Sequence, residues 1–328
     1  MGLQVRARRI LGHGAIPVPA LIALLAVSGV LTILNTRFMS VTNLQTIVDQ
    51  TAIPAVIVVG LTFVVLTGSI DLSVEGVVAV GSMVTSLLVM NDRNDLALGA
   101  LAVPVAVIVG GGLGLVAGLA VTRLRIPSFL ATIATWYIGR GIAELLFGDK
   151  AKPRVLDEGF IAWSHPLFLG FSGLVWLAIV VVLFGLLLQQ FARFGRYAYA
   201  IGGSEETTKL SGIPVRRYRL GAFIFSSLCF ALAGAMVTAR TGVGAVAAGD
   251  GQLFLAVSGV VIGGTLLIGG RGGVLHSVVG VLIMVVIANG MILADVSPYW
   301  QQVVQGAVVL VAVIATVWRQ RARLRVIL

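Results

Sequence analysis

Long apolar stretches separated by short polar ones run through the whole chain. Windows of about 20 residues, the length that crosses about 30 Å of hydrocarbon, occur ten times. Their approximate limits are residues 16–35, 50–67, 72–90, 96–120, 126–147, 167–189, 218–238, 252–269, 273–294 and 300–318. The pattern predicts an all-α integral membrane protein, with about ten transmembrane or half-membrane helices in a single domain over residues 1–328.

The third window is preceded by the polar stretch TGSIDLSVEG, residues 67–76. Gly68 follows an apolar run and suits the position just after a helix. Asp71 and Ser73 are favourable N-cap residues, and Glu75 would lie in the first turn of the next helix. We therefore expect a broken helix near residues 67–73, which must face protein or a water-filled cavity because lipid cannot satisfy its backbone.

The acidic residues of this stretch allow two interpretations. Asp71 can be a helix cap satisfied by neighbouring amides, or it can line a solute pathway, and the two roles are compatible. An ionisable residue at membrane depth is a functional candidate. The predicted pathway residues are Thr67, Asp71, Ser73, Thr132 and Asn289.

Two other polar features lie within apolar windows. Arg140 and Glu144 are four residues apart and can pair on one helix face, as a structural pair or as part of the pathway. Asn289 stands alone in an apolar span, where a hydrogen bond between helices is its expected structural role.

Glycines mark two further stretches. Gly110, Gly114 and Gly118 share one helix face and predict close packing against another helix. The stretch GGTLLIGGRGG, residues 263–273, is too rich in glycine for a simple packing face. A break or re-entrant turn is at least as strongly expected there as helix packing.

Composition supports a membrane protein. The chain is 58% hydrophobic and 11% charged, with a mean hydropathy of +1.05. Its net charge of +10 does not indicate nucleic-acid binding, because the basic residues lie between apolar segments. With the N-terminus inside, most of the 23 basic residues fall on the cytoplasmic side. This predicts cytoplasmic termini, an outer loop at 148–166 and a cytoplasmic loop at 190–217 where a partner docks.

Motifs for catalysis and cofactor binding are missing from the sequence. None of the lysines follows a glycine as in a P-loop, and His13, His165 and His276 are isolated. The single cysteine, Cys229, lies in an apolar span and is expected to pack as a small apolar residue. We therefore expect no catalytic residue, no metal site and no cofactor, and energy from an ion gradient or a partner.

Five stretches resemble, in order, the permease subunits of bacterial ribose/galactose-type ABC importers. They are GLTFVVLTGSIDLSVEG, RIPSFLATIATWYIGRGIAE, GRYAYAIGGSEETTKLSGIPV, LAGAMVTARTGVGAVAAGDGQLFLAVSGVVIGGTLLIGGRG and NGMILADVSPYWQQVVQGAVVLVAV, and together they cover about residues 40–318. The resemblance implies the ABC-importer permease fold in the bacterial inner membrane. It implies transport of a monosaccharide or related polyol by alternating access.

The resemblance also implies partners. They are ABC ATPase subunits that bind the ATP, a periplasmic or lipid-anchored solute-binding protein, and a second permease subunit, identical or similar. The coupling segment to the ATPase would be AIGGSEETTKLSGI. Its predicted coupling residues are Gly202, Gly203, Ser204, Glu205, Glu206, Ser211 and Gly212. Ser204 can cap a helix beginning at Glu205, which Gly212 would end.

The chain departs from the family pattern at a few positions. Ser69 and Glu75 replace glycines of the usual GGIDLSVG, Phe254 stands where an acidic residue is common, and Ser204 replaces an asparagine. These differences bear on the solute more than on the fold. Autoinducer-2, a nucleoside or a branched-chain amino acid are alternative solutes. A gradient-driven secondary transporter that uses Asp71 or Glu75 is the alternative from another class.

Overall fold

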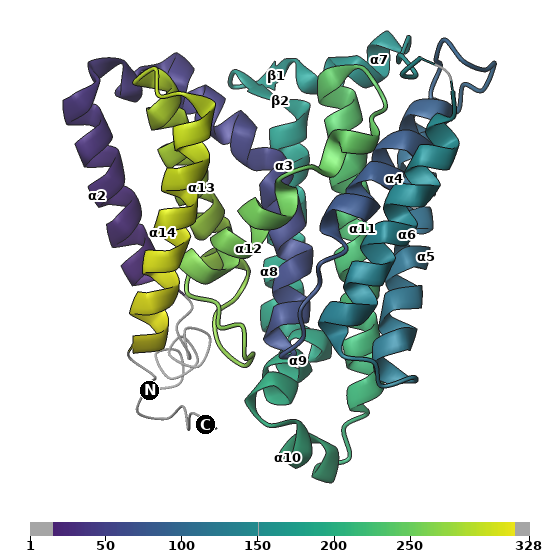
Figure 1. Cartoon of the computed structure of the whole chain (residues 1–328), viewed down its shortest axis with the longest axis vertical. Helices are drawn as coiled ribbons and strands as arrows, with labels where there is room; N and C mark the ends of the chain where they lie inside the picture. Colours follow the sequence, from purple (N-terminus) through teal and green to yellow (C-terminus); the bar gives the residue numbers. More distant parts are fainter. Residues whose placement is uncertain (1–15, 150, 319–328) are drawn as a thin grey trace, which may run out of the picture.

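The computed structural model describes residues 16–149 and 151–318. Thirteen α-helices and one two-stranded hairpin lie in these residues (Figure 1). Ten helices match the ten predicted windows: α2 Val18–Leu34, α3 Val41–Leu66, α4 Val74–Leu88, α5 Ala102–Thr122, α6 Ser128–Phe147, α8 Gly173–Phe191, α11 Val215–Thr241, α12 Gln252–Ile262, α13 Val274–Leu293 and α14 Pro298–Trp318. The predicted all-α fold class is confirmed.

Some predicted boundaries are wrong. Helix α3 begins at Val41, nine residues before the apolar window, because polar residues of its first turns find partners in other helices. Helix α12 ends at Ile262, so the window 252–269 is mostly a half-length helix followed by turns. The window beginning at 167 starts with the hairpin of β1 (Pro166–Phe168) and β2 (Phe171–Ser172), and its helix begins only at Gly173.

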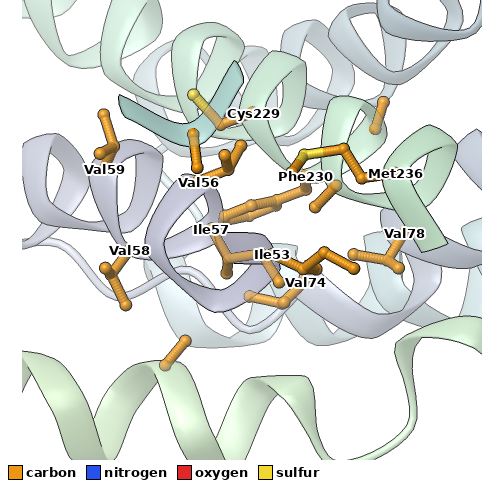
Figure 2. Packing of buried hydrophobic residues seen from close by; sticks show 14 of the residues in the cluster. Ile53, Val56, Ile57, Val58, Val59, Val74, Val78, Cys229, Phe230 and Met236 are labelled. Carbon is orange, nitrogen blue, oxygen red and sulfur yellow. The ribbon is translucent and has the colours of Figure 1, made fainter. Parts of the chain in front are cut away.

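Two helices form the centre of the bundle. Every residue of α3 from Thr51 to Leu66 is buried, and α11 packs against α3, α4 and α5. Figure 2 shows Phe230 of α11 beside Ile57 of α3. The predicted packing face of α5 is confirmed, because a Cβ added at Gly110, Gly114 or Gly118 would meet atoms of α11. Cys229 is buried, as expected.

Two breaks interrupt the bundle. The first break, residues 67–73, joins α3 to α4 as an extended segment that rises from one end of the bundle toward its middle (Figure 1). It confirms the predicted broken helix, and Gly68 has the expected left-handed backbone, with φ of +73°. The second break, residues 263–273, joins α12 to α13 and confirms the predicted glycine-rich turn.

The two ends of the bundle differ. One end, here the α10 end, carries α9 (Arg193–Gly203) and α10 (Glu205–Leu210), which project at the bottom of Figure 1. The opposite end, the α7 end, carries α7 (Glu158–Ile161), β1 and β2. The predicted loops 148–166 and 190–217 thus lie at opposite ends, and both contain short helices. The basic residues before 16 and after 318, with Lys150, lie outside the described residues.

Candidate functional site

The carboxylate of Asp71 is buried within the first break, where the side chain is 1% exposed. Its Oδ1 accepts from the amide of Ser73 at 3.0 Å and from the hydroxyl of Ser73 at 2.6 Å. Its Oδ2 accepts from the hydroxyl of Ser226 in α11 at 2.6 Å. Asp71 therefore receives hydrogen bonds from one amide and two hydroxyls, and it ties the break to the central helix.

Hydroxyls of α6 satisfy the backbone of the same break. Thr132 Oγ1 accepts from the amide of Leu72 at 3.0 Å, and Ser128 Oγ accepts from the amide of Ile70 at 3.0 Å. The hydroxyl of Thr67, at the end of α3, donates to the carbonyl of Val64 at 2.7 Å. Four predicted pathway residues thus lie in the break or directly beside it, and all four are buried. Ser128 and Ser226 complete the network and were not predicted, because nothing local marks them.

Asn289 lies apart from the other four predicted pathway residues. Its side chain exchanges two hydrogen bonds with Asn43 of α3, at 2.9 and 3.0 Å. This confirms the expected hydrogen bond between helices. The same end of α13 meets α2 through Asn35, whose side-chain amide donates to the carbonyl of Leu293.

The predicted coupling segment folds as the helix α10. Ser204 caps it by accepting from the amide of Thr207, while Glu205 and Glu206 occupy the first turn. Ser211 is the C-cap residue, and Gly212 follows with a left-handed φ of +76°. The expected helix, its cap and its end are confirmed, and its contact with an ATPase remains a prediction.

Arg219 connects α10 to the first break. Its Nη2 lies 2.6 Å from Glu205 Oε2 and 3.5 Å from the carbonyl oxygen of Thr67. Lys209 Nζ also contacts the Glu205 carboxylate, at 2.5 Å. Hydrogen bonds from Arg219 and Lys209 lower the pKa of Glu205 to about 2. The sequence marked Arg219 only as one of many basic residues, because its two partners are far apart in the chain.

Helix α9 contacts the second break. The hydroxyl of Tyr199 donates to the carbonyl of Gly272 at 2.6 Å, and burial raises the pKa of Tyr199 to about 12. Gly202 lies so close to the carbonyl oxygen of Leu66 and the amide of Gly270 that a Cβ would overlap both. The amide of Gly270 in turn donates to the carbonyl of Leu66 at 3.1 Å. The coupling segment and both breaks therefore meet at one backbone junction.

A second polar cluster lies where α4 and α12 begin. Glu75, in the first turn of α4, accepts through Oε1 from the amide of Gly251, the N-cap residue of α12, at 3.1 Å. Arg140 of α6 pairs with Glu144 at 3.3 Å, as predicted, and its Nη1 lies 3.8 Å from Asp250. Each of these three side chains is about half exposed, at 42%, 60% and 54%.

Two half-open pockets, of about 470 and 450 Å³, lie at the α7 end. Leu177 of α8 and Trp163 line both, and most other lining residues are also apolar. No predicted pathway residue lines either cavity. These cavities therefore do not connect the polar breaks into a route for a polar solute. Within the described residues, no group of three or more His, Cys, Asp or Glu side chains could hold a metal ion.

Comparison with known proteins places the chain in a family. Residues 43–313 match the family described as branched-chain amino acid transport system / permease component. The chain belongs to this permease family. It is therefore a multi-pass membrane protein and a transport subunit.

Several named relatives cover most of the chain. It is 34% identical over 300 residues to the ribose import permease of Escherichia coli K12, covering 90% of this chain and 92% of that protein. It is 34% identical over 287 residues to the ribose import permease of Bacillus subtilis, covering 87% and 88%. It is 34% identical over 265 residues to the L-arabinose transport system permease of Escherichia coli K12, covering 80% and 79%. No solved structure matches the chain.

Proposed function

We propose that this permease is the transmembrane subunit of an ATP-driven importer, and that it moves a monosaccharide or related polyol into the cytoplasm by alternating access. Relatives named for ribose and for L-arabinose support a sugar as the solute. The family description names branched-chain amino acids, so such an amino acid remains an alternative solute, with autoinducer-2 and nucleosides.

The observation that carries this proposal is the attachment of α9 and α10 to both breaks. Glu205 reaches the first break through Arg219, and Tyr199 holds the second through the Gly272 carbonyl. A force applied to α10 from outside the chain would therefore act directly on the two non-helical segments of the bundle. In membrane transporters, broken helices of this kind form the solute and ion sites around which the rest of the bundle moves.

Partners follow from the same proposal. An ABC ATPase would bind ATP and dock on α10, because the chain has no P-loop of its own. A periplasmic or lipid-anchored binding protein would deliver the solute at the α7 end, and a second permease subunit would complete the pathway. This orientation places the α10 end and both termini in the cytoplasm of a bacterial cell, with the bundle in the inner membrane.

Transport by the reconstituted complex tests the energy source. The probes are labelled D-ribose and L-arabinose, supplied with a solute-binding protein and an ABC ATPase from the same genome. We expect uptake to require ATP and to survive a proton ionophore. Uptake that stops with the ionophore while ATP is present would instead support a gradient-driven carrier using Asp71 or Glu75.

Deletion of residues 203–212 tests the coupling role separately. We expect the deletion to abolish uptake and solute-stimulated ATP hydrolysis while the bundle still inserts in the membrane. Full nucleotide-dependent uptake by the deletion variant would show that α10 is not the coupling segment.

A further inference from the structure

Helix α6 carries charged residues within a span-length helix. It has 20 residues, enough to cross the hydrocarbon, yet it is not among the five described helices whose composition suits a membrane span. One of its faces, here the α6 face, carries Ala134, Tyr137, Arg140, Gly141 and Glu144. Their spacing of three and four residues places them on one side of the helix. Tyr137 is 65% exposed, and Arg140 and Glu144 are about half exposed.

The opposite face of α6 is buried against α4. Gly139 packs on the backbone of Gly76, and Gly76 packs on the backbone of Trp136. This contact sets Tyr137 and Arg140 level with the first turn of α4, which begins inside the bundle (Figure 1). Arg140 is seven residues before the last residue of α6, or about 10 Å along the helix axis. The charged part of the α6 face therefore lies at membrane depth.

Charges from three segments meet on this face. Arg140 and Glu144 belong to α6, Asp250 belongs to the segment before α12, and Glu75 of α4 holds the α12 N-terminus beside them. Half-exposed ionised groups in contact with lipid would be costly, so such groups in membrane spans face water or protein. The two apolar cavities offer no polar route through the chain.

We infer that the α6 face lines the aqueous route and contacts the solute, with Tyr137, Arg140, Glu144 and Asp250 as the contact residues. This inference rests on the proposed function. The inference extends the proposed function, because it assigns solute contact to an open face of the subunit and not to the buried residues of the first break. There, a second permease subunit would close the route from the other side.

The chemistry of these residues suits a neutral, polyhydroxylated solute. A guanidinium group has five N–H donors, and only the Nε of Arg140 makes a hydrogen bond to another described residue. Its separation of 3.8 Å from Asp250 is too long for a hydrogen bond. Arg140 can therefore donate to solute hydroxyls, and Glu144 and Asp250 can accept from them. Tyr137, beside Trp136 at 5.1 Å between ring centroids, offers an aromatic surface for the C–H face of a sugar ring.

Cysteine accessibility tests the position of the route. Cys229, the only native cysteine, is buried and would be replaced by alanine. Gly141→Cys then reports on the α6 face, and Gly112→Cys on α5 is the matched control. Both are helical glycines at which an added Cβ meets nothing within 4 Å, and Gly112 lies among the exposed apolar residues Ile108, Leu115 and Val116. A charged, membrane-impermeant methanethiosulfonate is applied to the assembled complex.

We expect Gly141→Cys to react about tenfold faster or more than Gly112→Cys, because the reactive thiolate forms in water and not in lipid. Millimolar D-ribose or L-arabinose should slow the reaction at Gly141→Cys only. Equal rates at the two sites would overturn the inference. So would a disulfide between two Gly141→Cys subunits with no labelling, since the face would then be a dry subunit contact. Neither outcome depends on ATP, so the labelling result can contradict this inference without contradicting the proposed energy source.

Substitution of Arg140 tests the contact itself. Arg140→Gln should lower the initial rate of ATP-driven D-ribose uptake about tenfold, the effect of losing one charged hydrogen bond to the solute. Arg140→Lys, which keeps the charge, should recover part of that rate. Membrane levels of each variant are checked by immunoblot, and Arg123→Gln, at the exposed C-cap of α5, is the matched control. Wild-type uptake by Arg140→Gln would overturn the role of Arg140.

Discussion

The two breaks of the bundle are built in different ways. The first break, residues 67–73, is held by side chains: Asp71, Ser73, Ser128, Thr132 and Ser226 satisfy its backbone and one another. The second break, residues 263–273, contains five glycines with positive φ, namely Gly264, Gly269, Gly270, Gly272 and Gly273. Fewer side chains hold it: Tyr199 and Thr265 bind its backbone, and Gln189 accepts from the amide of Val274 just after it.

The first break, here the anchored break, is held in place by side-chain hydrogen bonds. The second break, here the contact break, is shaped for close backbone contact with other segments. Hydroxyls and a carboxylate fix the first break to α6 and α11, and a buried network of this kind is sensitive to the loss of any member. Glycines let the second break come within backbone contact of α9 and of Leu66. The coupling segment can therefore act on the second break directly, and on the first through Arg219 and the Leu66 carbonyl.

The largest effect is expected where both breaks meet α9. A Cβ at Gly202 would overlap the Leu66 carbonyl oxygen and the Gly270 amide, backbone atoms that cannot rotate away. We expect Gly202→Ala to cost about 3 kcal/mol, the upper range for overpacking, and to lower ATP-driven uptake strongly. Thermal unfolding in detergent and uptake in proteoliposomes measure the two effects.

Gly203→Ala is the matched control for this prediction. It is the neighbouring glycine in the same helix, and an added Cβ meets nothing within 4 Å. We expect its thermal stability in detergent to match that of the wild type. Equal stability of the two alanine variants would mean that the junction does not require close backbone contact.

The next effect concerns the anchored break. Asp71→Ala removes the acceptor of three hydrogen bonds and leaves the buried Ser73 amide and hydroxyl without this partner, which should cost about 1–3 kcal/mol. Asp71→Asn keeps an acceptor oxygen and should cost less. Thermal unfolding of both variants in detergent checks the order. If alanine and asparagine destabilise equally, the hydroxyl network does not hold the first break.

A smaller effect is expected at the contact break. Tyr199→Phe removes one hydrogen bond to the Gly272 carbonyl and should cost about 0.5–1.5 kcal/mol. Because α9 also touches the break through Gly202, transport should fall only partly. Tyr197→Phe, in the same helix and without a hydrogen bond from its hydroxyl among the described residues, is the control. A full loss of uptake in Tyr199→Phe alone would show that this one bond carries the coupling.

The smallest effect on stability is expected at Glu205. The Glu205 side chain is partly exposed, so its ion pairs contribute at most about 1 kcal/mol. Glu205→Gln should therefore weaken the coupling of ATP hydrolysis to uptake by about two- to fivefold. Its folded-state pKa is lowered to about 2, so the ion pair contributes fully above the ordinary value of 4.5 and is lost only as pH falls toward 2.

The ratio of wild-type to Glu205→Gln coupling should therefore be the same at pH 5.5 and pH 8. Glu158→Gln, at an exposed carboxylate in the first turn of α7 at the opposite end, serves as the control. A ratio that shrinks between pH 8 and pH 5.5 would contradict an ion pair of this strength.

Features that depend on local chemistry could be predicted from the amino-acid sequence. Apolar length predicted ten helices, the polar stretch around Asp71 predicted the first break, and glycine density predicted the second. The cap at Ser204 and the pairing of Arg140 with Glu144 were also predicted, because capping and four-residue spacing act within one or two helical turns.

The distant groups that complete each feature could be identified only in the folded chain. Ser226, the partner of Asp71, is 155 residues away, and the pairing of Asn43 with Asn289 lets α3 begin in a polar stretch. Arg219, Tyr199 and Gly202 gain their roles from the meeting of segments far apart in the chain. A buried polar group needs a partner, but its own sequence neighbourhood does not say which helix supplies one, because helix packing makes that choice.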